Sequence, residues 1–568
     1  MFALARTVAR ACLVLVALGL APAAEASAAQ VSQDARVTMS DGVMVQTTLT
    51  GEAPLAARPV IVEFSPYGRN SATTPDGPAY NYLLVQIRGT GDSDGRFDAL
   101  GARTQADVAQ TLSWACHQPW SNGRLGLNGF SASAIAVYNS LHLSLPCVRA
   151  AVLKSGTFEL YRDLLWPGGV SNALPGLGVL GLIGAPATAQ GLTRLQRNPL
   201  SSLELALGLF GAGLNGGLLH PSLDSWWQER GFRGEAQHLP ILMIDGFFDV
   251  ESRGAFQAYQ RLREDGAHLI VIGAHDGSPA GTDGGKAATK AWFDRYLLGA
   301  ANGIDSHPRV RLWMADGSRE SYLAGKFVRY DASDWPVPGT QWSSWWLDAT
   351  PSGSGNSLTH GSLSASDPAR TRTQSYVSVP SIPSMSDTPN TALVGGFGLN
   401  SLFSALPQLT ETNLAEPLAL TYTGKPLSSD LVSAGPASLE LRMSSAAPET
   451  DLWAVVTDVW PDGSSHPVAT GRLRSSYPDV ALPSSLQDSQ GDIVQPYGDY
   501  SHKTFTPALT ERTYHVELWP IGNRFKRRDR IRLVILGPSA ASLPSGLTVN
   551  TVRVGGPDGS RLLLPVLP

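Results

Sequence analysis

A serine lies where a strand pattern changes to a helix pattern, in the stretch RLGLNGFSASAIAVYNS (residues 124–140). Gly129 and Ser133 flank Ser131 at a distance of two positions, and small residues continue into the helix pattern. A strand that ends in Gly-x-Ser and turns sharply into a helix is a nucleophile elbow, which needs small neighbours so that strand and helix pack closely. The first amide groups of the helix then point at an oxyanion formed beside the serine. The pattern predicts Ser131 as a nucleophile, although a serine replaces the second glycine of the usual motif.

A serine hydroxyl needs a base, and the base needs a carboxylate that orients it. After a nucleophile elbow the chain order is acid and then histidine, both on loops that follow strands. Asp249 follows the pattern ILMIDGFF and His275 follows HLIVIGA, so both meet this requirement. Asp245 is the alternative acid, but it lies at the end of the strand pattern and before the loop. We therefore expect Ser131, His275 and Asp249 to act as nucleophile, base and orienting acid.

The elements around these residues predict a parallel sheet covered by helices. PVIVEF (59–64) and YLLVQI (82–87) are nearly continuous apolar runs, which are typical of strands buried on both faces. Helix patterns alternate with them, as in a sheet wound with right-handed crossovers. Residues 157–238 are rich in Gly and Leu and keep no strand pattern, which predicts a helical cap. We expect an α/β fold class, with an α/β-hydrolase domain over residues 30–156 and 239–303.

The C-terminal part, residues 304–568, consists of short alternating segments separated by Gly, Pro, Ser and Asp. ASLELRMSS, DLWAVVTDVW and DRIRLVILG are examples, and helix patterns are almost absent. This pattern predicts a separate all-β domain, a jelly-roll β-sandwich. An alternative is a binding module on a protein that has lost catalysis, but the joint presence of serine, acid and histidine in the expected order argues against it.

The N-terminus carries the features of a secretory signal. Arg6 and Arg10 precede the apolar run ACLVLVALGLA, and small residues follow at Ala24 and Ala26. The apolar run is shorter than the roughly 20 residues that a membrane span needs, which argues against a membrane anchor. We expect residues 1–28 to be a signal peptide and the mature protein to be exported to the periplasm or the medium, with no membrane span.

Two cysteines, Cys116 and Cys147, remain after removal of the signal. An oxidising compartment favours a bridge between them. Cys116 ends the helix pattern before the elbow strand and Cys147 follows the helix after it, and right-handed crossovers bring these two helix ends to one edge of the sheet. The alternative is two buried free thiols. We expect a disulfide.

The composition bears on the partners of the chain. With 43% hydrophobic residues, 16% charged residues and a formal net charge of −5, the chain is typical of a globular protein and gives no reason to expect nucleic acid. DSDG (92–95) resembles part of a calcium loop but lacks the remaining ligands. We expect no metal and no cofactor, and a small-molecule ester or acyl compound as substrate; a homo-oligomer is left open.

Motifs along nearly the whole mature chain resemble one family of serine hydrolases. They include SPYGRN, RGTGDSDGRFD, TLSWACHQPWSNGRLGLNGFS, GFFDV, WFDRYLLG and ELWPIGNRFKRRDRIRL. The chain resembles the family that holds bacterial cocaine esterase, α-amino-acid ester hydrolases and X-prolyl dipeptidyl peptidases. The resemblance implies an α/β-hydrolase domain, a helical cap inserted before the strand of the acid, and a C-terminal jelly roll.

The resemblance also implies an oxyanion hole made by Tyr67, the tyrosine of the PY pair, and the amide of Ala132. One side-chain donor and one backbone donor suit a tetrahedral oxyanion. The sequence departs from the family in three places. ASA follows the nucleophile in place of Tyr-x-Gly, the loop GAHDGSP around His275 is shorter than usual, and the segment between Tyr67 and Leu83 is brief.

The substrate class is open, because members of the family share the triad. Recognition of a free α-amine needs carboxylates that compensate a desolvated ammonium group. Glu251 is one candidate, and Trp226 and Trp227 are candidates for lining the acyl pocket; the alternatives are a solvated loop residue and cap core. The cap offers three further acidic residues, Glu204, Asp224 and Glu229. Because one carboxylate is weak support for ammonium binding, we expect an esterase, with an X-prolyl dipeptidyl peptidase or an α-amino-acid ester hydrolase or acylase as the alternative.

Overall fold

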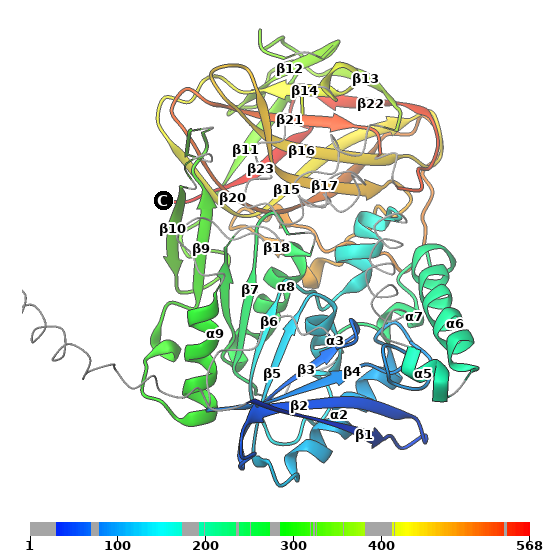
Figure 1. Cartoon of the computed structure of the whole chain (residues 1–568). Helices are drawn as coiled ribbons and strands as arrows, with labels where there is room; N and C mark the ends of the chain where they lie inside the picture. Colours follow the sequence, from blue (N-terminus) through cyan, green and yellow to red (C-terminus); the bar gives the residue numbers. More distant parts are fainter. Residues whose placement is uncertain are drawn as a thin grey trace, which may run out of the picture.

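The computed structural model describes the chain in two parts, a helix-covered sheet and an all-β part that lies above it in Figure 1. The described residues are all those other than 1–29, 70–78, 173–191, 198, 234–237, 250, 273–284, 319, 322–323, 325, 356, 381–411, 414 and 539–541. The expected signal peptide and His275 therefore lie outside the described residues.

The first part is built on a sheet whose inner strands are parallel. Its strands are β1 (Gln30–Thr38), β2 (Met44–Glu52), β3 (Arg58–Ser65), β4 (Asn81–Gln86), β5 (Ser121–Phe130), β6 (Val148–Lys154), β7 (Ile241–Asp245), β8 (His268–Val271), β9 (Val310–Ala315) and β10 (Phe327–Ala332). Strands β4-β3-β5-β6-β7-β8-β9 pair in this order and in parallel. The hairpin β1-β2 continues the sheet beyond β4, and β10 ends it beyond β9, both by antiparallel pairing.

Helices cover this sheet on both faces. They are α2 (Ala102–Cys116), α3 (Ala132–Ser140), α8 (Ser252–Leu262) followed by η4 (Arg263–Asp265), and α9 (Lys286–Phe293) followed by η5 (Asp294–Leu298) and η6 (Ile304–Ser306). Alternate residues of one strand belong to different cores: Val60 and Val62 pack with α2 and α3, whereas Ile61 packs with Phe293 of α9. Burial on both faces explains the continuous apolar runs of the strands. The expectation of an N-terminal α/β domain, a parallel sheet covered by helices, is confirmed.

The described elements of the insertion between β6 and β7 are helices, apart from an isolated bridge between Glu159 and Gly231. Its elements are η1 (Tyr161–Leu165), η2 (Pro167–Gly169), α5 (Leu192–Arg197), α6 (Ser201–Leu214), η3 (Asn215–Leu219) and α7 (Ser225–Gln228). Helices α5, α6 and α7 lie at one side of the molecule in Figure 1. Each helix within the described ranges is too short or too polar to span a bilayer.

The second part is all-β, as expected. Its strands are β11 (Gln341–Asp348), β12 (Thr359–Ser364), β13 (Arg372–Ser378), β14 (Leu420–Thr423), β15 (Leu431–Ser445), β16 (Asp451–Val459), β17 (Ser465–Arg474), β18 (Leu486–Gln487), β19 (Ile493–Gln495), β20 (Arg512–Phe525), β21 (Arg530–Leu536), β22 (Thr548–Val554) and β23 (Arg561–Val566), with the short helices η9 (Glu416–Leu418) and η10 (Leu482–Ser484). The pairings β11-β12-β14-β21-β16-β17-β20-β15-β23 return to β11. These strands therefore close into a barrel, which leaves no free sheet edge in the ring.

The first sheet continues past residue 304, where we expected the all-β domain to begin, because β9 and β10 pair with it. The domain boundary at residue 304 stays a prediction. The alternating residues of RVRLWMA are compatible with either sheet, and pairing with β8 decides between them. A bridge from Ala315 of β9 to Asn523 of β20 joins the sheet to the barrel.

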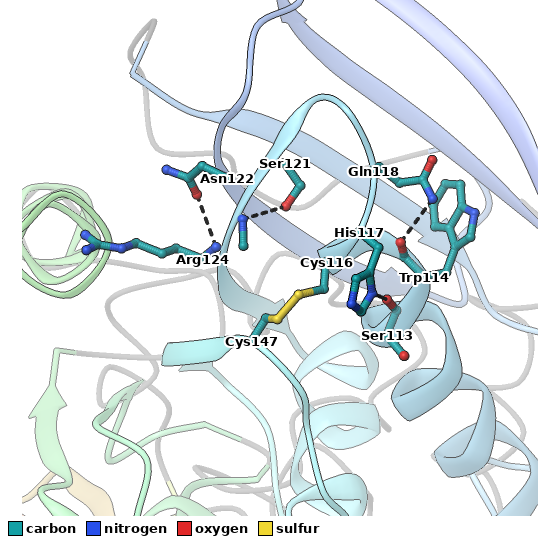
Figure 2. Close-up of a disulfide and its surroundings, with 10 residues drawn as sticks. Ser113, Trp114, Cys116, His117, Gln118, Ser121, Asn122, Arg124 and Cys147 are labelled. Carbon is teal, nitrogen blue, oxygen red and sulfur yellow. Dashed lines mark hydrogen bonds between the residues drawn. A yellow bond between two sulfur atoms is a disulfide. The ribbon is translucent and has the colours of Figure 1, made fainter.

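A disulfide joins Cys116 at the end of α2 to Cys147, just before β6 (Figure 2). The two Cα atoms are 6.1 Å apart and 31 residues separate them in the chain. The Cys147 carbonyl accepts a hydrogen bond from the amide of Leu125 in β5, at 2.9 Å. The bridge therefore closes a loop that contains β5 and α3, the two elements on either side of Ser131.

Candidate active site

Ser131 lies at the junction of β5 and α3 in a conformation that residues with a side chain rarely adopt. Its backbone angles are φ 53° and ψ −126°, outside the regions favoured by L-residues. The Ser131 amide donates to the carbonyl of Lys154 in β6 at 2.9 Å. Strained backbone of this kind persists only where the surroundings impose it, and it is concentrated at functional sites. The geometry is that of a nucleophile elbow.

The small residues around Ser131 are required by close backbone contact. A Cβ atom on Gly129 would lie 2.7 Å from the amide nitrogen of Ala134, and one on Gly156 would lie 2.7 Å from the Ala134 Cβ. Ser133, which replaces the second glycine of the motif, points into the interior, where its hydroxyl donates to Glu63 at 3.2 Å. A buried acceptor thus accommodates the hydroxyl at this position.

Tyr67 and the amide of Ala132 lie together beside the elbow. The Ala132 amide donates to the Tyr67 hydroxyl oxygen at 3.2 Å, and the Tyr67 hydroxyl also hydrogen-bonds Ser131. Burial raises the pKa of Tyr67, and the charges of Glu251 and Glu63 add to this effect. The hydroxyl therefore stays protonated at neutral pH, so two hydrogen-bond donors are available next to Ser131.

Asp249 lies in a tight turn after β7 and is completely buried. Its amide donates to the carbonyl of Gly246 at 3.2 Å, and its carboxylate accepts the amide of Glu251 at 3.0 Å. The loop after β7 thus carries two acidic residues, Asp249 inside the protein and Glu251 at the wall of the cavity described below. His275, the expected base, lies outside the described residues.

Asp245, the alternative acid, is the last residue of β7 and is also buried. One of its oxygens accepts the amide of Gly246 at 2.7 Å. Burial raises the pKa of Asp245 well above its ordinary value, and the charges of Asp249 and Glu251 contribute. A carboxyl group with a raised pKa gives up its proton less readily and is less suited to stabilise an imidazolium ion, so Asp249 is the better candidate.

A cavity of about 70 Å³ opens beside Ser131 and Ala132. Apolar side chains from the cap and the loop before α2 form most of its wall, including Phe97, Leu164 and Trp227. The structure places both Trp226 and Trp227 in this wall, with their rings 4.7 Å apart and edge to face. Phe97 belongs to the motif RGTGDSDGRFD and Leu164 lies in a segment of no special pattern, but neither was expected at the cavity from the sequence.

Glu251 is the one charged side chain among the described residues of this wall, and it is 3% exposed. The cap carboxylates considered from the sequence lie elsewhere. Glu204 is near Arg194 at 3.4 Å, and Glu229 is near Arg230 at 3.7 Å. Asp224 accepts the amide of Trp226 at 3.0 Å and pairs with His220. Glu251 therefore has no second carboxylate beside it in the described part of the wall.

The structure shows no metal-type cluster of three or more His, Cys, Asp or Glu side chains within the described residues. In the DSDG stretch, Asp92 lies 3.4 Å from Arg69 and Asp94 pairs with Arg36. Arginine partners explain these acidic residues as parts of ion pairs.

A nucleophile elbow on a parallel sheet, with a capped apolar cavity beside it, defines a serine hydrolase. Residues 41–276 match the X-Pro dipeptidyl-peptidase (S15) family, and residues 302–551 match the X-Pro dipeptidyl-peptidase C-terminal non-catalytic domain. The chain belongs to this family of serine hydrolases, which act on ester or peptide bonds and include cocaine esterase.

Relatives cover nearly the full length of the chain. Cocaine esterase of Rhodococcus sp. is 25% identical over an alignment of 517 residues, which covers 82% of this chain and 86% of that protein. A CocE/NonD family hydrolase from Staphylococcus aureus has a TM-score of 0.74 at 19% identity, covering 95% of this chain and 94% of its own. An α-amino acid ester hydrolase has a TM-score of 0.70 at 15% identity, covering 96% and 98%. The two structural neighbours establish the fold of the whole chain.

Proposed function

We propose that the protein is an exported serine hydrolase that cleaves carboxylic esters or related acyl bonds through a Ser-His-Asp triad. Ser131 is the nucleophile, His275 the base and Asp249 the acid that orients it. The observation that carries this proposal is the position of Ser131 at the elbow, at the wall of an apolar cavity and next to two hydrogen-bond donors. The cocaine esterase relative supports ester hydrolysis.

In the proposed mechanism, the Ser131 hydroxyl attacks the substrate carbonyl carbon while His275 accepts its proton. The carbonyl oxygen becomes an oxyanion and receives hydrogen bonds from the Tyr67 hydroxyl and the Ala132 amide, in place of the bond that these two groups make to each other. The imidazolium then protonates the leaving alcohol, and an acyl-enzyme remains on Ser131. Water, activated by His275, hydrolyses the acyl-enzyme by the same steps.

The neighbouring serines provide a matched test. Ser131→Ala should lower the hydrolysis of p-nitrophenyl esters by about 10⁴-fold or more. Ser133→Ala should keep activity within a few-fold, because Ser133 bonds the interior residue Glu63. A reactive phosphonate should label Ser131, detected by peptide mass spectrometry. Full activity of the Ser131→Ala variant would disprove the assignment.

A second candidate function is hydrolysis of substrates with a free α-amine, as an X-prolyl dipeptidyl peptidase or an α-amino-acid ester hydrolase. The observation that favours it is Glu251, a buried carboxylate in the wall of an otherwise apolar cavity. A single carboxylate compensates an ammonium ion only in part, so we favour an esterase without a strict need for the amine.

One set of assays decides between the two functions. The purified enzyme is compared on an aryl ester, on an amino-acid ester with a free or an acetylated amine, and on an X-Pro-anilide. We expect the aryl ester to have the highest kcat/KM, and Glu251→Gln to leave that value nearly unchanged. Highest kcat/KM on the X-Pro-anilide, together with loss of turnover on acetylation, would establish the peptidase function instead.

We also propose that the protein is exported and that its domains have the boundaries expected from the sequence. The N-terminal pattern supports cleavage after about residue 28, and N-terminal sequencing of protein from the periplasm or medium tests it. We propose residues 30–156 and 239–303 as the core of the catalytic domain, 157–238 as its cap and the C-terminal part as a domain of the jelly-roll type, which the family resemblance supports.

A further inference from the structure

The residues that carry the proposed catalytic acid form a short segment between β7 and α8. We call residues 246–249 together with Glu251 the acid loop. The barrel strand β20 faces this region: it lies at the side of the barrel that is turned toward β7 and α8 (Figure 1), and it contacts α8. Side chains on both sides of Asp249 make contacts with β20.

The first contact is an ion pair on the C-terminal side of Asp249. Arg253, in the first turn of α8, is four residues beyond Asp249 and 1% exposed. Its Nε lies 2.9 Å from both carboxylate oxygens of Glu517 in β20, 264 residues away in the chain. Removal of either partner leaves a buried charge without its counter-ion, which proteins tolerate poorly. Arg253 is thereby held to the barrel at the start of α8.

Carboxylates of the cap hold Nη1 of the Arg253 guanidinium. Its Nη1 lies 2.7 Å from Asp163 and 3.4 Å from Glu159, both in the cap. Glu159 also pairs with Arg162 at 2.7 Å and accepts the Tyr497 hydroxyl. Of the carboxylates that hold Arg253, only Glu517 belongs to the barrel. The guanidinium therefore connects the start of α8, which follows the acid loop, to the cap and the barrel.

The second contact is steric and lies on the N-terminal side of Asp249. Phe247 is 1% exposed, and its ring lies so close to Gly522 of β20 that a Cβ there would be 2.3 Å from Cε2. The ring also packs near Phe256 of α8, with centroids 5.4 Å apart, and near Trp335, at 6.4 Å. The Phe247 ring fits at this position only because residue 522 is a glycine without a side chain.

We propose that β20 positions the catalytic acid, with Glu517 holding Arg253 and Gly522 receiving Phe247 so that Asp249 is fixed from both sides. This inference rests on the proposed triad. Glu517 and Gly522 are positioning residues, because neither lines the cavity and both act through the segment that carries Asp249. The barrel then helps to align the catalytic triad.

The first experiment compares Glu517→Gln with Glu416→Gln in the full chain. Glu416 is the matched control: it forms an even more buried pair with Arg532, at 2.8 Å, inside the barrel. We expect Glu517→Gln to lower kcat on p-nitrophenyl acetate by roughly 10- to 100-fold with little change in KM, because small displacements of catalytic groups have effects of this size. Glu416→Gln should keep the wild-type kcat.

The pH profile separates positioning from a general loss of stability. The titratable groups shown near Asp249 in the described structure are Glu251 and Asp245, whose pKa burial raises. A displaced Asp249 stabilises the imidazolium less, so the acid limb of kcat/KM should move to lower pH in Glu517→Gln. The limb should not move in Glu416→Gln. A wild-type kcat and an unmoved limb in folded Glu517→Gln would overturn the proposal.

A second variant tests the same idea without a change of charge. Gly522→Ala places a methyl group against Phe247, whereas Gly424→Ala in the barrel meets only ordinary contacts, the nearest at 3.4 Å. We expect Gly522→Ala alone to lower kcat and to move the acid limb in the same direction; if it does neither, the proposal fails even where Glu517→Gln does not fold. An active Ser131→Ala variant would instead refute the proposed function itself, so the two failures are distinguishable.

Discussion

At the residue scale, the site depends on a few short contacts that hold Ser131 and its two neighbouring donors. The strained backbone of Ser131 places its hydroxyl beside the Ala132 amide and the Tyr67 hydroxyl. The donors face one another without substrate, so an oxyanion finds them already oriented. Preorganised donors of this kind cost no reorganisation at the moment of reaction.

Tyr67→Phe removes one of these donors and leaves the ring in place. We expect kcat to fall by about 10²–10³-fold, which corresponds to about 2.7–4 kcal/mol of lost transition-state stabilisation. Steady-state kinetics on an aryl ester measure the change, and thermal unfolding confirms that the variant is folded. A decrease of less than ten-fold in a folded variant would contradict the role of the hydroxyl.

At the element scale, β5 and α3 form the elbow, and the elements next to them hold it in place. The disulfide from the end of α2 to the start of β6 closes a loop around both. The cap supplies the far wall of the cavity through η1, η3 and α7. In the proposed function, the sheet therefore positions the nucleophile and the cap limits the size of the acyl group.

The disulfide should be present in protein from an oxidising compartment and should stabilise the fold. Closing a loop with a sequence separation of 31 residues contributes about 3–4 kcal/mol in the chain-entropy model. Cys116→Ser combined with Cys147→Ser should therefore lower the free energy of unfolding by roughly that amount. Alkylation before reduction, followed by mass spectrometry, tests the bridge directly: two alkylated cysteines would show free thiols.

The volume of the cavity predicts a preference for short acyl chains. At about 70 Å³ it is less than half of the roughly 150 Å³ that an apolar cavity offers to benzene. We expect kcat/KM to be higher for p-nitrophenyl acetate than for the octanoate by about ten-fold or more. Trp226→Ala, which removes a ring from the wall, should shift this ratio toward the octanoate. An unchanged ratio would place the acyl group elsewhere.

At the scale of the whole molecule, buried charges join the catalytic part, the cap and the barrel. Arg162 and Arg253 face Glu159, Asp163 and Glu517, so the carboxylates outnumber the guanidinium groups. Burial raises the pKa of Asp163 to about 6, whereas Arg162 and Arg253 outweigh burial and lower the pKa of Glu159. This cluster therefore gains a proton on mild acidification.

Asp163→Asn tests the charge on this cluster. Because the pKa of Asp163 is higher in the folded protein than its ordinary value of 3.8, the stability that its proton contributes is present below pH 4 and is lost as the pH rises through about 6. The difference in the free energy of unfolding, wild type minus Asp163→Asn, should fall by about 3 kcal/mol as the pH rises from 4 to above 6. Urea unfolding at pH 4, 5, 6 and 7 measures it; a difference that is constant or rises with pH would refute the assignment.

Local sequence determined the elbow, the parallel sheet and the all-β character of the C-terminal part. The turn at Ser131 requires small residues at fixed positions in the same short segment, and burial on both faces requires continuous apolar runs such as PVIVEF. Each of these signals depends on backbone conformation and on neighbours within a few residues, so it can be recognised from the sequence alone.

Only the tertiary structure decided which side chains meet across the fold. It placed β9 and β10 in the first sheet, gave the Ser133 hydroxyl its partner Glu63, and raised the pKa of Asp245 through burial. It also joined Arg253 to Glu517, which is 264 residues away. A strand with alternating apolar residues is compatible with either sheet. The partner of a buried charge cannot be predicted from the spacing of residues near it in the sequence. Pairing and desolvation arise only when distant segments pack together, because both depend on what surrounds a group in space.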